Sequence, residues 1–461
     1  MFIWSALITL IITGIAGYLG KLKVNTSKDF ITGGNKLGIL GVTSMLMGAI
    51  IGGASTVGTA QMAYNRGIGA IWFILGLSIS SILLGLLYAK QVDQKKNETI
   101  PHILGQTYGK KARTAASLLL SGGIFIHING QVIAVIALFT AIFNLSTFTS
   151  AVIVVALLII YVIFGGFWGG TLVGAVKTVL LYSTSLISGY ILFFHLGGGR
   201  EIFAYFPKEP WFNVFSNGIA NDSASGIATV VGVLSTQTYF QTVIAGKNSK
   251  VSRYSAFLTA FLVFPIGIVC TAIGMYMRIH YPNIVPSEAF PLFLQNHLHP
   301  VLGGISIATV LISSIATGAG LALGMATMFV KDVYKGLINP QADDKLQLYL
   351  LRLSIVVIGC MTFGVVMKNQ DSMVLDWGFL SMIFRATPIF LPLMAAMFFK
   401  NRLKAESGIY AIIGGPAASM LWILLGYDKM TSLYIGLGAG LMILVCMNLR
   451  HEEAKSKNTS C

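Results

Sequence analysis

The chain has 461 residues, of which 55% are hydrophobic and only 10% are charged. Because soluble domains are about 25% charged, this composition excludes a soluble enzyme and indicates a membrane protein with many crossings. The formal charge of +15 would suggest nucleic acid as the partner of a soluble protein. In a membrane protein it raises a different question, namely which side of the bilayer holds the positive residues.

Apolar segments long enough to cross a membrane recur along the whole chain. A transmembrane helix needs about 20 apolar residues. Thirteen candidate crossings lie near residues 1–20, 38–60, 68–89, 114–143, 150–164, 171–196, 226–245, 254–277, 304–330, 349–367, 377–398, 408–426 and 431–449. We therefore predict an all-α polytopic membrane protein with about 13 transmembrane helices, surrounded by the lipid bilayer.

The first segment sets the predicted orientation. It has no basic start, and Lys21 and Lys23 follow it. This order indicates an uncleaved helix with its N-terminus outside. With that orientation most Lys and Arg fall on the cytoplasmic side, together with the C-terminus. The pattern predicts a multi-pass protein of the plasma (cell inner) membrane and leaves no need for a nucleic-acid partner.

Two segments are poorly suited to remain continuous helices. Residues 47–58 read MGAIIGGASTVG, and residues 217–241 are rich in Asn, Ser, Gly and Gln. Close packing of small residues is one interpretation, and an unwound turn that binds ions or solutes is the other. The two segments open successive five-helix blocks, which is the arrangement of inverted-repeat transporters. We predict a single transmembrane domain with a leading helix and linker (1–37), a first repeat (38–196), a second repeat (226–398), two extra helices (408–449) and a cytoplasmic tail (450–461).

Several motifs in order along the chain resemble the sodium:solute symporter family. They include IGGASTVGTAQMAYNRG at 51–67, QTYFQTVIAGK at 237–247 and Lys-Asp-Val-Tyr at 331–334. The resemblance implies a LeuT-type fold of two inverted five-helix repeats, with one helix before and two after. It also implies secondary active transport of a small solute by alternating access, usually driven by sodium. No catalytic residues and no cofactor are expected, apart from a sodium ion.

The resemblance also implies a sodium site. Its carbonyl ligands would belong to Gly48, Ile51 and Ser313, and its hydroxyl ligand to Thr317. A second hydroxyl position is occupied by Ala316, so the site lacks one oxygen of the set that a hard cation prefers. No other metal site is expected.

Lys177 is a second departure from the family pattern. It stands inside a predicted span, one turn after Gly174, where many family members carry an acid. In the wider superfamily some proton-coupled carriers place a Lys amine on this helix where sodium would sit. The alternatives are therefore sodium coupling by family default, or proton-coupled or uncoupled transport with Lys177 in place of the ion. A lysine that snorkels to the membrane surface is the structural interpretation.

Arg385 is the other cation inside a predicted span, where a central arginine costs at least about 2.5 kcal/mol. Its guanidinium suits a carboxylate, although a structural arginine bound to carbonyls is the alternative. No Asp or Glu stands in mid-span. We predict an anionic or zwitterionic, carboxylate-bearing solute that is bound by Ser55, Gln61, His127, Gln131, Gln237 and Arg385.

Overall fold

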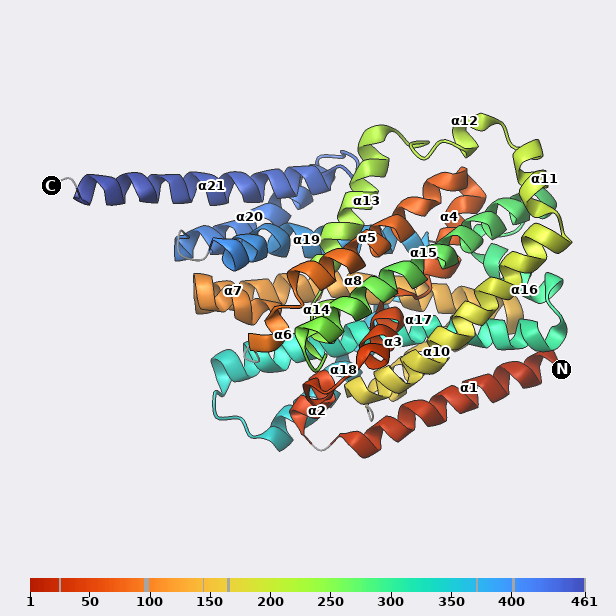
Figure 1. Cartoon of the computed structure of the whole chain (residues 1–461), viewed down its shortest axis with the longest axis horizontal. Coiled ribbons are helices and arrows are strands. Elements are labelled where there is room, and N and C mark those ends of the chain that lie inside the picture. The colour runs from red at the N-terminus through yellow and green to blue at the C-terminus, as the bar shows by residue number, and fades with distance from the viewer. Residues whose placement is uncertain are drawn as a thin grey trace.

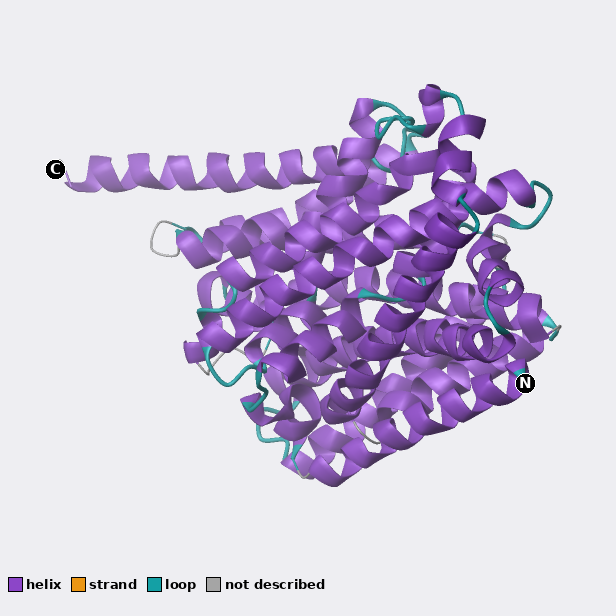
Figure 2. Cartoon of the chain, turned by 45° about the vertical axis from the view of Figure 1, so that its right-hand side comes forward, coloured by secondary structure: helices purple, strands orange, loops and turns teal. Residues whose placement is uncertain are grey.

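The computed structural model describes residues 1–24, 26–94, 99–143, 145–163, 166–369, 372–399 and 403–459. Over these residues the chain is a bundle of helices without strands (Figures 1 and 2). The helices are α1 (Phe2–Leu19), α2 (Ser27–Thr32), α3 (Ile39–Ile50), α4 (Thr59–Arg66), α5 (Ile71–Leu87), α6 (Gln91–Gln94), α7 (Ile100–Tyr108), α8 (Lys110–Phe143), α9 (Thr147–Ile163), α10 (Gly166–Tyr190), α11 (Gly198–Tyr205), α12 (Lys208–Trp211), α13 (Ile219–Leu234), α14 (Gln237–Ile244), α15 (Ser249–His280), α16 (Ala289–His297), α17 (Pro300–Met328), α18 (Asp344–Val366), α19 (Val374–Phe398), α20 (Ala405–Leu424) and α21 (Ser432–Thr459).

The observed helices follow the predicted crossings. Each of the thirteen predicted segments overlaps a helix of the bundle. Within the described part of the chain, nine helices are long and apolar enough to cross a membrane, and the bent pair α13–α14 makes a tenth. Three further apolar helices are shorter, namely α3, α9 and residues Ser432–Asn448 of α21. The all-α membrane architecture is confirmed, whereas the number of crossings stays a prediction.

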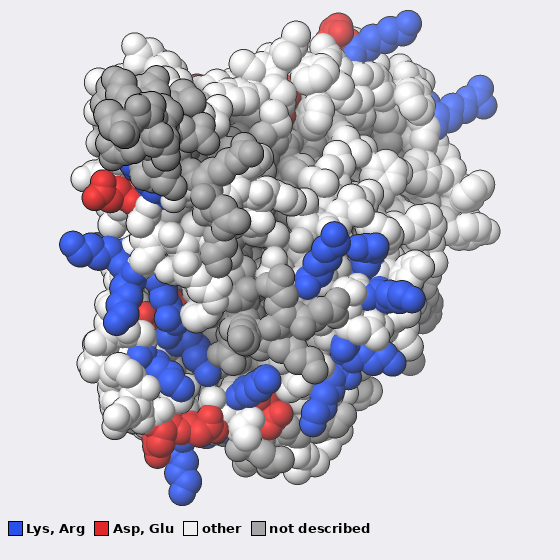
Figure 3. Space-filling view, turned by 60° about the vertical axis from the view of Figure 1, so that its left-hand side comes forward, with Lys and Arg blue, Asp and Glu red and all other residues white. Residues whose placement is uncertain are grey.

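One end of the bundle carries many positively charged side chains. The chain begins and ends at opposite ends of the long axis, and α21 extends beyond the other helices on the C-terminal side (Figure 1). Figure 3 shows the end near which α7 and α20 lie, with many Lys and Arg side chains gathered on it. A positive end is typical of the cytoplasmic side. The outward N-terminus and cytoplasmic C-terminus remain predictions.

Both predicted repeats begin with a broken helix. In the first, α3 stops at Ile50, Ile51 is extended, and the chain resumes as a wide turn over Ala54–Gly58 before α4. In the second, α13 and α14 meet at an angle of 49° across Ser235 and Thr236. Backbone groups freed at such breaks are available to bind ions and solutes.

Glycines allow the helices around the first break to pack closely. A Cβ on Gly52 would lie 2.5 Å from Oε1 of Gln131 on α8, and a Cβ on Gly53 would lie 2.7 Å from Oγ of Ser314 on α17. Real Cβ atoms do not approach other atoms so closely. The break therefore lies in direct contact with α8 and α17, which supply the side chains of the site described next.

Candidate functional site

The amine of Lys177 lies where α10, α3 and α17 meet. The residue is only 1% exposed. Its Nζ donates to the Gly48 carbonyl at 2.7 Å, to the Ser313 carbonyl at 2.9 Å and to the Thr317 hydroxyl at 3.3 Å. An ammonium group has three N–H donors. These three oxygens therefore satisfy a protonated Lys177 completely.

The direction of Lys177 depends on a close approach of α10 to α3. A Cβ on Gly174, one turn before Lys177, would lie 2.6 Å from the Ser44 carbonyl of α3. Glycine at this position lets the two helices touch, and the lysine then reaches across α3 to α17. The side chain points into the bundle, whereas snorkelling would direct it to the membrane surface.

The residues that the resemblance assigned to the sodium site lie together around this amine. The Thr317 hydroxyl is 2.9 Å from the Gly48 carbonyl and 3.1 Å from the Ile51 carbonyl, and the Ser313 hydroxyl donates to Ile51 at 2.9 Å. The Ser314 hydroxyl does not replace the missing ligand, because it donates to the Val310 carbonyl of its own helix. The oxygen cluster is thus formed by α3 and α17, with the Lys177 amine bound to it.

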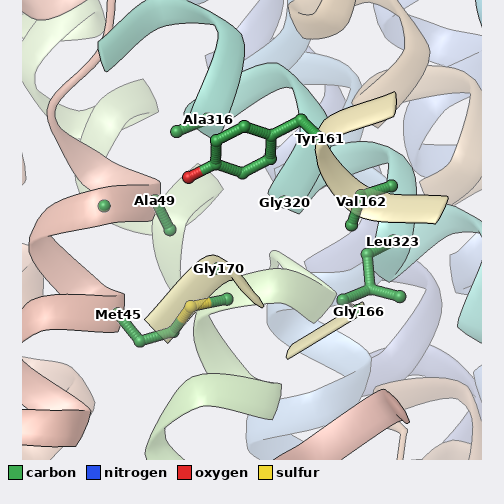
Figure 4. Close-up of a pocket in the computed structure, with 10 residues that line it drawn as sticks. Met45, Ala49, Tyr161, Val162, Gly166, Gly170, Ala316, Gly320 and Leu323 are labelled. Atoms are coloured by element: carbon green, nitrogen blue, oxygen red, sulfur yellow. The ribbon is translucent and has the colours of Figure 1, made fainter. Parts of the chain in front are cut away.

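A small cavity adjoins the oxygen cluster on the side of Ala316 (Figure 4). Its volume is about 10 Å³, which is close to the minimum for one water molecule. Figure 4 shows the Tyr161 side chain directed between Ala49 and Ala316. Among the described residues, the buried Tyr161 hydroxyl has no hydrogen-bond partner. The cavity is lined by Ala316 and by Gly48, whose carbonyl accepts from Lys177.

A second group of polar side chains runs from the first helix break toward the second. The amide of Gly53 donates to Oε1 of Gln131 at 2.8 Å, and Nε2 of Gln131 lies 2.8 Å from Nε2 of His127. Nδ1 of His127 lies 2.9 Å from Nη2 of Arg385 on α19. We call these four groups the central polar chain. It joins three of the predicted solute-binding residues to the unwound backbone.

Arg385 connects this chain to the second break. The guanidinium is fully buried, and its Nη1 donates to the Thr236 hydroxyl at 2.7 Å. Its Nε donates to the Ser381 carbonyl at 3.2 Å. No carboxylate of the described residues lies within 4 Å of it. Arg385 is therefore held by neutral groups, and its charge has no protein counter-charge there.

The other three predicted solute-binding residues have different surroundings. Oε1 of Gln61 accepts from the Val374 amide at the start of α19, and Oε1 of Gln237 accepts from the Ile100 amide at the start of α7. The Ser55 hydroxyl donates to the Ile50 carbonyl across the first break. The structure thus brings His127, Gln131 and Arg385 together, and it places Gln61 and Gln237 at the ends of other helices.

Two groups of the site were missed in the sequence. Thr236 was overlooked beside Gln237, although it stands in the second break and binds Arg385. The Gly53 amide is a backbone donor that no side-chain search would find. The Gly53 amide stands in the first break, where backbone donors lose their helical partners, so the glycine-rich segment itself is the signal for it.

A larger cavity is lined in part by residues of α4, α13 and α19. It has a volume of about 730 Å³ and its lining combines charged and aromatic side chains, among them Arg66, Asp222, Asp376, Trp377 and Phe379. Trp377 packs against Gly130, the neighbour of Gln131, since a Cβ on that glycine would lie 2.8 Å from Cβ of Trp377. The contact between α19 and α8 therefore separates the cavity from the polar chain.

Comparisons with known proteins agree with this architecture. The family model for the sodium:solute symporter family matches residues 30–415. The chain is 23% identical over 450 residues to the high-affinity proline transporter PutP of Bacillus subtilis, covering 93% of each chain. It is 26% identical to the human high affinity choline transporter 1, covering 72% of this chain and 60% of that protein. A solved structure of a Na⁺-coupled sialic acid symporter, in a substrate-bound outward-open state, has a TM-score of 0.84 at 18% identity and covers 96% of both chains.

Proposed function

Since this chain belongs to the sodium:solute symporter family and is a cation-coupled solute symporter, we propose that its coupling cation is a proton, carried by the Lys177 amine in place of a sodium ion. The observation that carries the proposal is the set of contacts made by this amine. Its three donors face the Gly48 carbonyl, the Ser313 carbonyl and the Thr317 hydroxyl. These are the oxygens that the family resemblance assigns to sodium.

Sodium and the Lys177 ammonium compete for one position. The amine lies at hydrogen-bond distance from both carbonyls, so an ion bound to the same oxygens would overlap it. Two unit charges repel by about 4 kcal/mol even at 4 Å and an effective dielectric constant of 20. A hard cation also needs more oxygens than this cluster offers, because position 316 is an alanine. Sodium therefore binds only if the lysine leaves.

Protonation of Lys177 links the two halves of the transporter. α3 and α10 belong to the first predicted repeat, and α17 belongs to the second. The ammonium donates to both α3 and α17, whereas a neutral amine has only two N–H donors for the same three oxygens. Loss of the proton thus leaves one of the three oxygens without a donor and weakens the contact of α10 with α3 and α17. This gives the proton the part that sodium plays by family default, namely to hold the two repeats in one arrangement.

The solute of this proposal is small and carries a negative group, as an anion or a zwitterion. Arg385 supports this choice, because it is a fully buried guanidinium without a carboxylate neighbour among the described residues. A buried charge without a counter-charge is costly. A solute carboxylate would supply that charge.

Uptake into proteoliposomes tests the coupling. We would measure L-proline, choline, sialic acid and acetate, each labelled, under an inward proton gradient without sodium and under an inward sodium gradient at equal pH. Accumulation above equilibrium under the proton gradient alone is expected. A steep requirement for the sodium gradient would overturn the proposal, and exchange that neither gradient concentrates would indicate an uncoupled carrier.

A further inference from the structure

The central polar chain contains too few hydrogen-bond acceptors. It has three contacts, between the Gly53 amide and Gln131, between Gln131 and His127, and between His127 and Arg385. Each contact needs one donor and one acceptor. The two ends of the chain, a backbone N–H and a guanidinium, are donors only. Between them a glutamine amide and a neutral histidine each offer one donor and one acceptor along the chain.

The count is therefore four donors against two acceptors for three contacts. If Gln131 accepts from Gly53, its NH₂ group donates to Nε2 of His127. The ring proton of the neutral histidine is then on Nδ1, where it faces the Arg385 guanidinium. If His127 accepts from Arg385, its other nitrogen donates to Oε1 of Gln131, and the Gln131 NH₂ group then faces the Gly53 amide. In either arrangement one contact joins two donors.

This shortage does not depend on how hydrogens are assigned. Turning the Gln131 amide or changing the His127 tautomer moves the unfavourable contact along the chain without removing it. Protonation of His127 adds a further donor and makes the shortage worse. Buried donors without acceptors are costly. The Met382 sulfur also lies 2.9 Å from Nη2 of Arg385, but it is a weak acceptor and takes only one of the two Nη2 protons. The contact between His127 and Arg385 therefore still lacks one acceptor.

We propose that an anionic oxygen of the transported solute, of the carboxylate class, supplies this acceptor by inserting between Nδ1 of His127 and Nη2 of Arg385. The chain then reads from the Gly53 amide to Gln131, from Gln131 to His127, and from both His127 and Arg385 to the solute oxygen. Every contact has one donor and one acceptor. The proposal rests on the proposed symport function and specifies its solute and its binding position.

Charge favours an anionic oxygen over a neutral one. A hydroxyl or carbonyl oxygen would correct the count, but it would leave the charge of Arg385 without a partner. Hydrogen bonds between a guanidinium and a carboxylate are about twice as strong as neutral ones. The cavity lined by Trp377 lies beyond the contact of this residue with Gly130, the neighbour of Gln131. Separation of α19 from α8 at this point would admit the solute.

The occupied chain also has a consequence for the two helix breaks. Arg385 reaches Thr236 in the second break, and Gln131 reaches Gly53 in the first. A solute oxygen between His127 and Arg385 completes an unbroken series of hydrogen bonds from one break to the other. The solute would thereby connect the two repeats at the centre of the bundle, as the Lys177 ammonium connects them at the ion site.

Substitutions at His127 separate the acceptor count from other effects. His127→Glu places two acceptors between Gln131 and Arg385, so the chain becomes complete without a solute. His127→Gln is the matched control, because it is similar in size and keeps one donor and one acceptor. We would purify both variants at one pH, without sodium and without a gradient, and measure thermal unfolding. The His127→Glu protein is expected to melt about 1–3 °C above His127→Gln.

The solute arm uses acetate, L-lactate, L-proline and sialic acid as probes, with L-prolinol as the analogue of L-proline that lacks a carboxylate. A carboxylate is expected to raise the melting temperature of the unmodified protein, whereas neither His127→Glu nor Arg385→Gln responds, since each supplies its own acceptor. His127→Glu that melts at or below His127→Gln would overturn the proposal, and so would equal protection by L-prolinol and L-proline. If His127→Glu does not fold, Arg385→Gln is used instead, because its side chain also supplies an acceptor. A carboxylate that raises the melting temperature of Arg385→Gln as much as that of the unmodified protein would overturn the proposal.

Failure of this inference differs from failure of proton coupling. Lys177→Met retains the central polar chain, so it is expected to keep the carboxylate-induced shift although it loses concentrative uptake. A carboxylate response that disappears in Lys177→Met alone would contradict the inference, because it would place the anion at the lysine.

Discussion

Replacing Lys177 with alanine is expected to produce a protein that binds sodium. The substitution removes the amine and leaves the Gly48 and Ser313 carbonyls and the Thr317 hydroxyl around an empty position. The Ile51 carbonyl adjoins them, because it accepts from Ser313 and faces Thr317. Oxygen ligands of this kind suit a hard cation, although their number is small for tight binding. We therefore expect weak but specific sodium binding.

The size of the effect follows from the geometry. Removing the amine loses three hydrogen bonds, each worth about 1.5–3 kcal/mol for a charged donor. The loss is offset in part, because a buried ammonium carries a desolvation penalty of several kcal/mol. Sodium at ten times its dissociation constant then stabilises the folded variant by about 1.4 kcal/mol. For a protein of 461 residues, with about 2.1 cal/mol/K of unfolding entropy per residue, that corresponds to a shift of about 1.5 °C in Tm.

Thermal unfolding in NaCl and in N-methyl-D-glucamine chloride, at equal ionic strength, measures the effect. The unmodified protein is expected to melt at the same temperature in both salts, whereas Lys177→Ala is expected to melt higher in NaCl. The double variant Lys177→Ala/Thr317→Val is the control, since it lacks the hydroxyl ligand and should not respond. Sodium stabilisation of the unmodified protein as strong as that of Lys177→Ala would refute the reasoning.

Three further predictions concern neighbouring contacts. Ala316→Ser added to Lys177→Ala supplies another hydroxyl ligand. It is expected to strengthen sodium binding about tenfold, or by about 1.4 kcal/mol, in the same melting assay. Unchanged binding would place residue 316 outside the oxygen cluster. Gly52→Ala would bring a Cβ within 2.5 Å of Gln131 Oε1. It should therefore destabilise the protein by about 1–3 kcal/mol and abolish uptake. Gly38→Ala is the control and should match the unmodified protein, because a Cβ there would have nothing within 4 Å. Asp332→Asn removes the charge of the buried carboxylate that accepts from Arg113 at 2.7 Å, and it should lower the free energy of unfolding by about 1–3 kcal/mol in denaturant melts. Asp343→Asn alters an exposed helix cap and should change little. Equal effects of the two substitutions would refute a role for the ion pair.

Much of the fold could be predicted because it depends on composition and spacing. Apolar segments of membrane length located the helices, and glycine-rich polar segments located both breaks. Lys177 could be singled out because a lysine inside an apolar span is costly and stands one turn from a glycine. The orientation of its amine could not be predicted, since it depends on how closely α10 approaches α3 at Gly174.

The solute site was harder to predict, because a polar residue near a break has several uses. Gln61, Gln237 and Gln131 are alike in the sequence as glutamines in or next to predicted spans, yet Gln61 and Gln237 accept from backbone amides at the starts of α19 and α7. Side-chain direction beyond a break follows from tertiary packing, which residue spacing does not contain. The role of the Gly53 amide depends likewise on the contact between the break and α8.

Solute-driven proton movement tests the central claim most directly. Proteoliposomes without sodium would contain a pH-sensitive dye, and an inward gradient of the transported solute would be imposed at equal starting pH. The account predicts that the lumen acidifies in step with solute entry, and that Lys177→Met admits solute down its gradient without acidification. Solute entry without acidification in the unmodified protein, or acidification that persists in Lys177→Met, would contradict it.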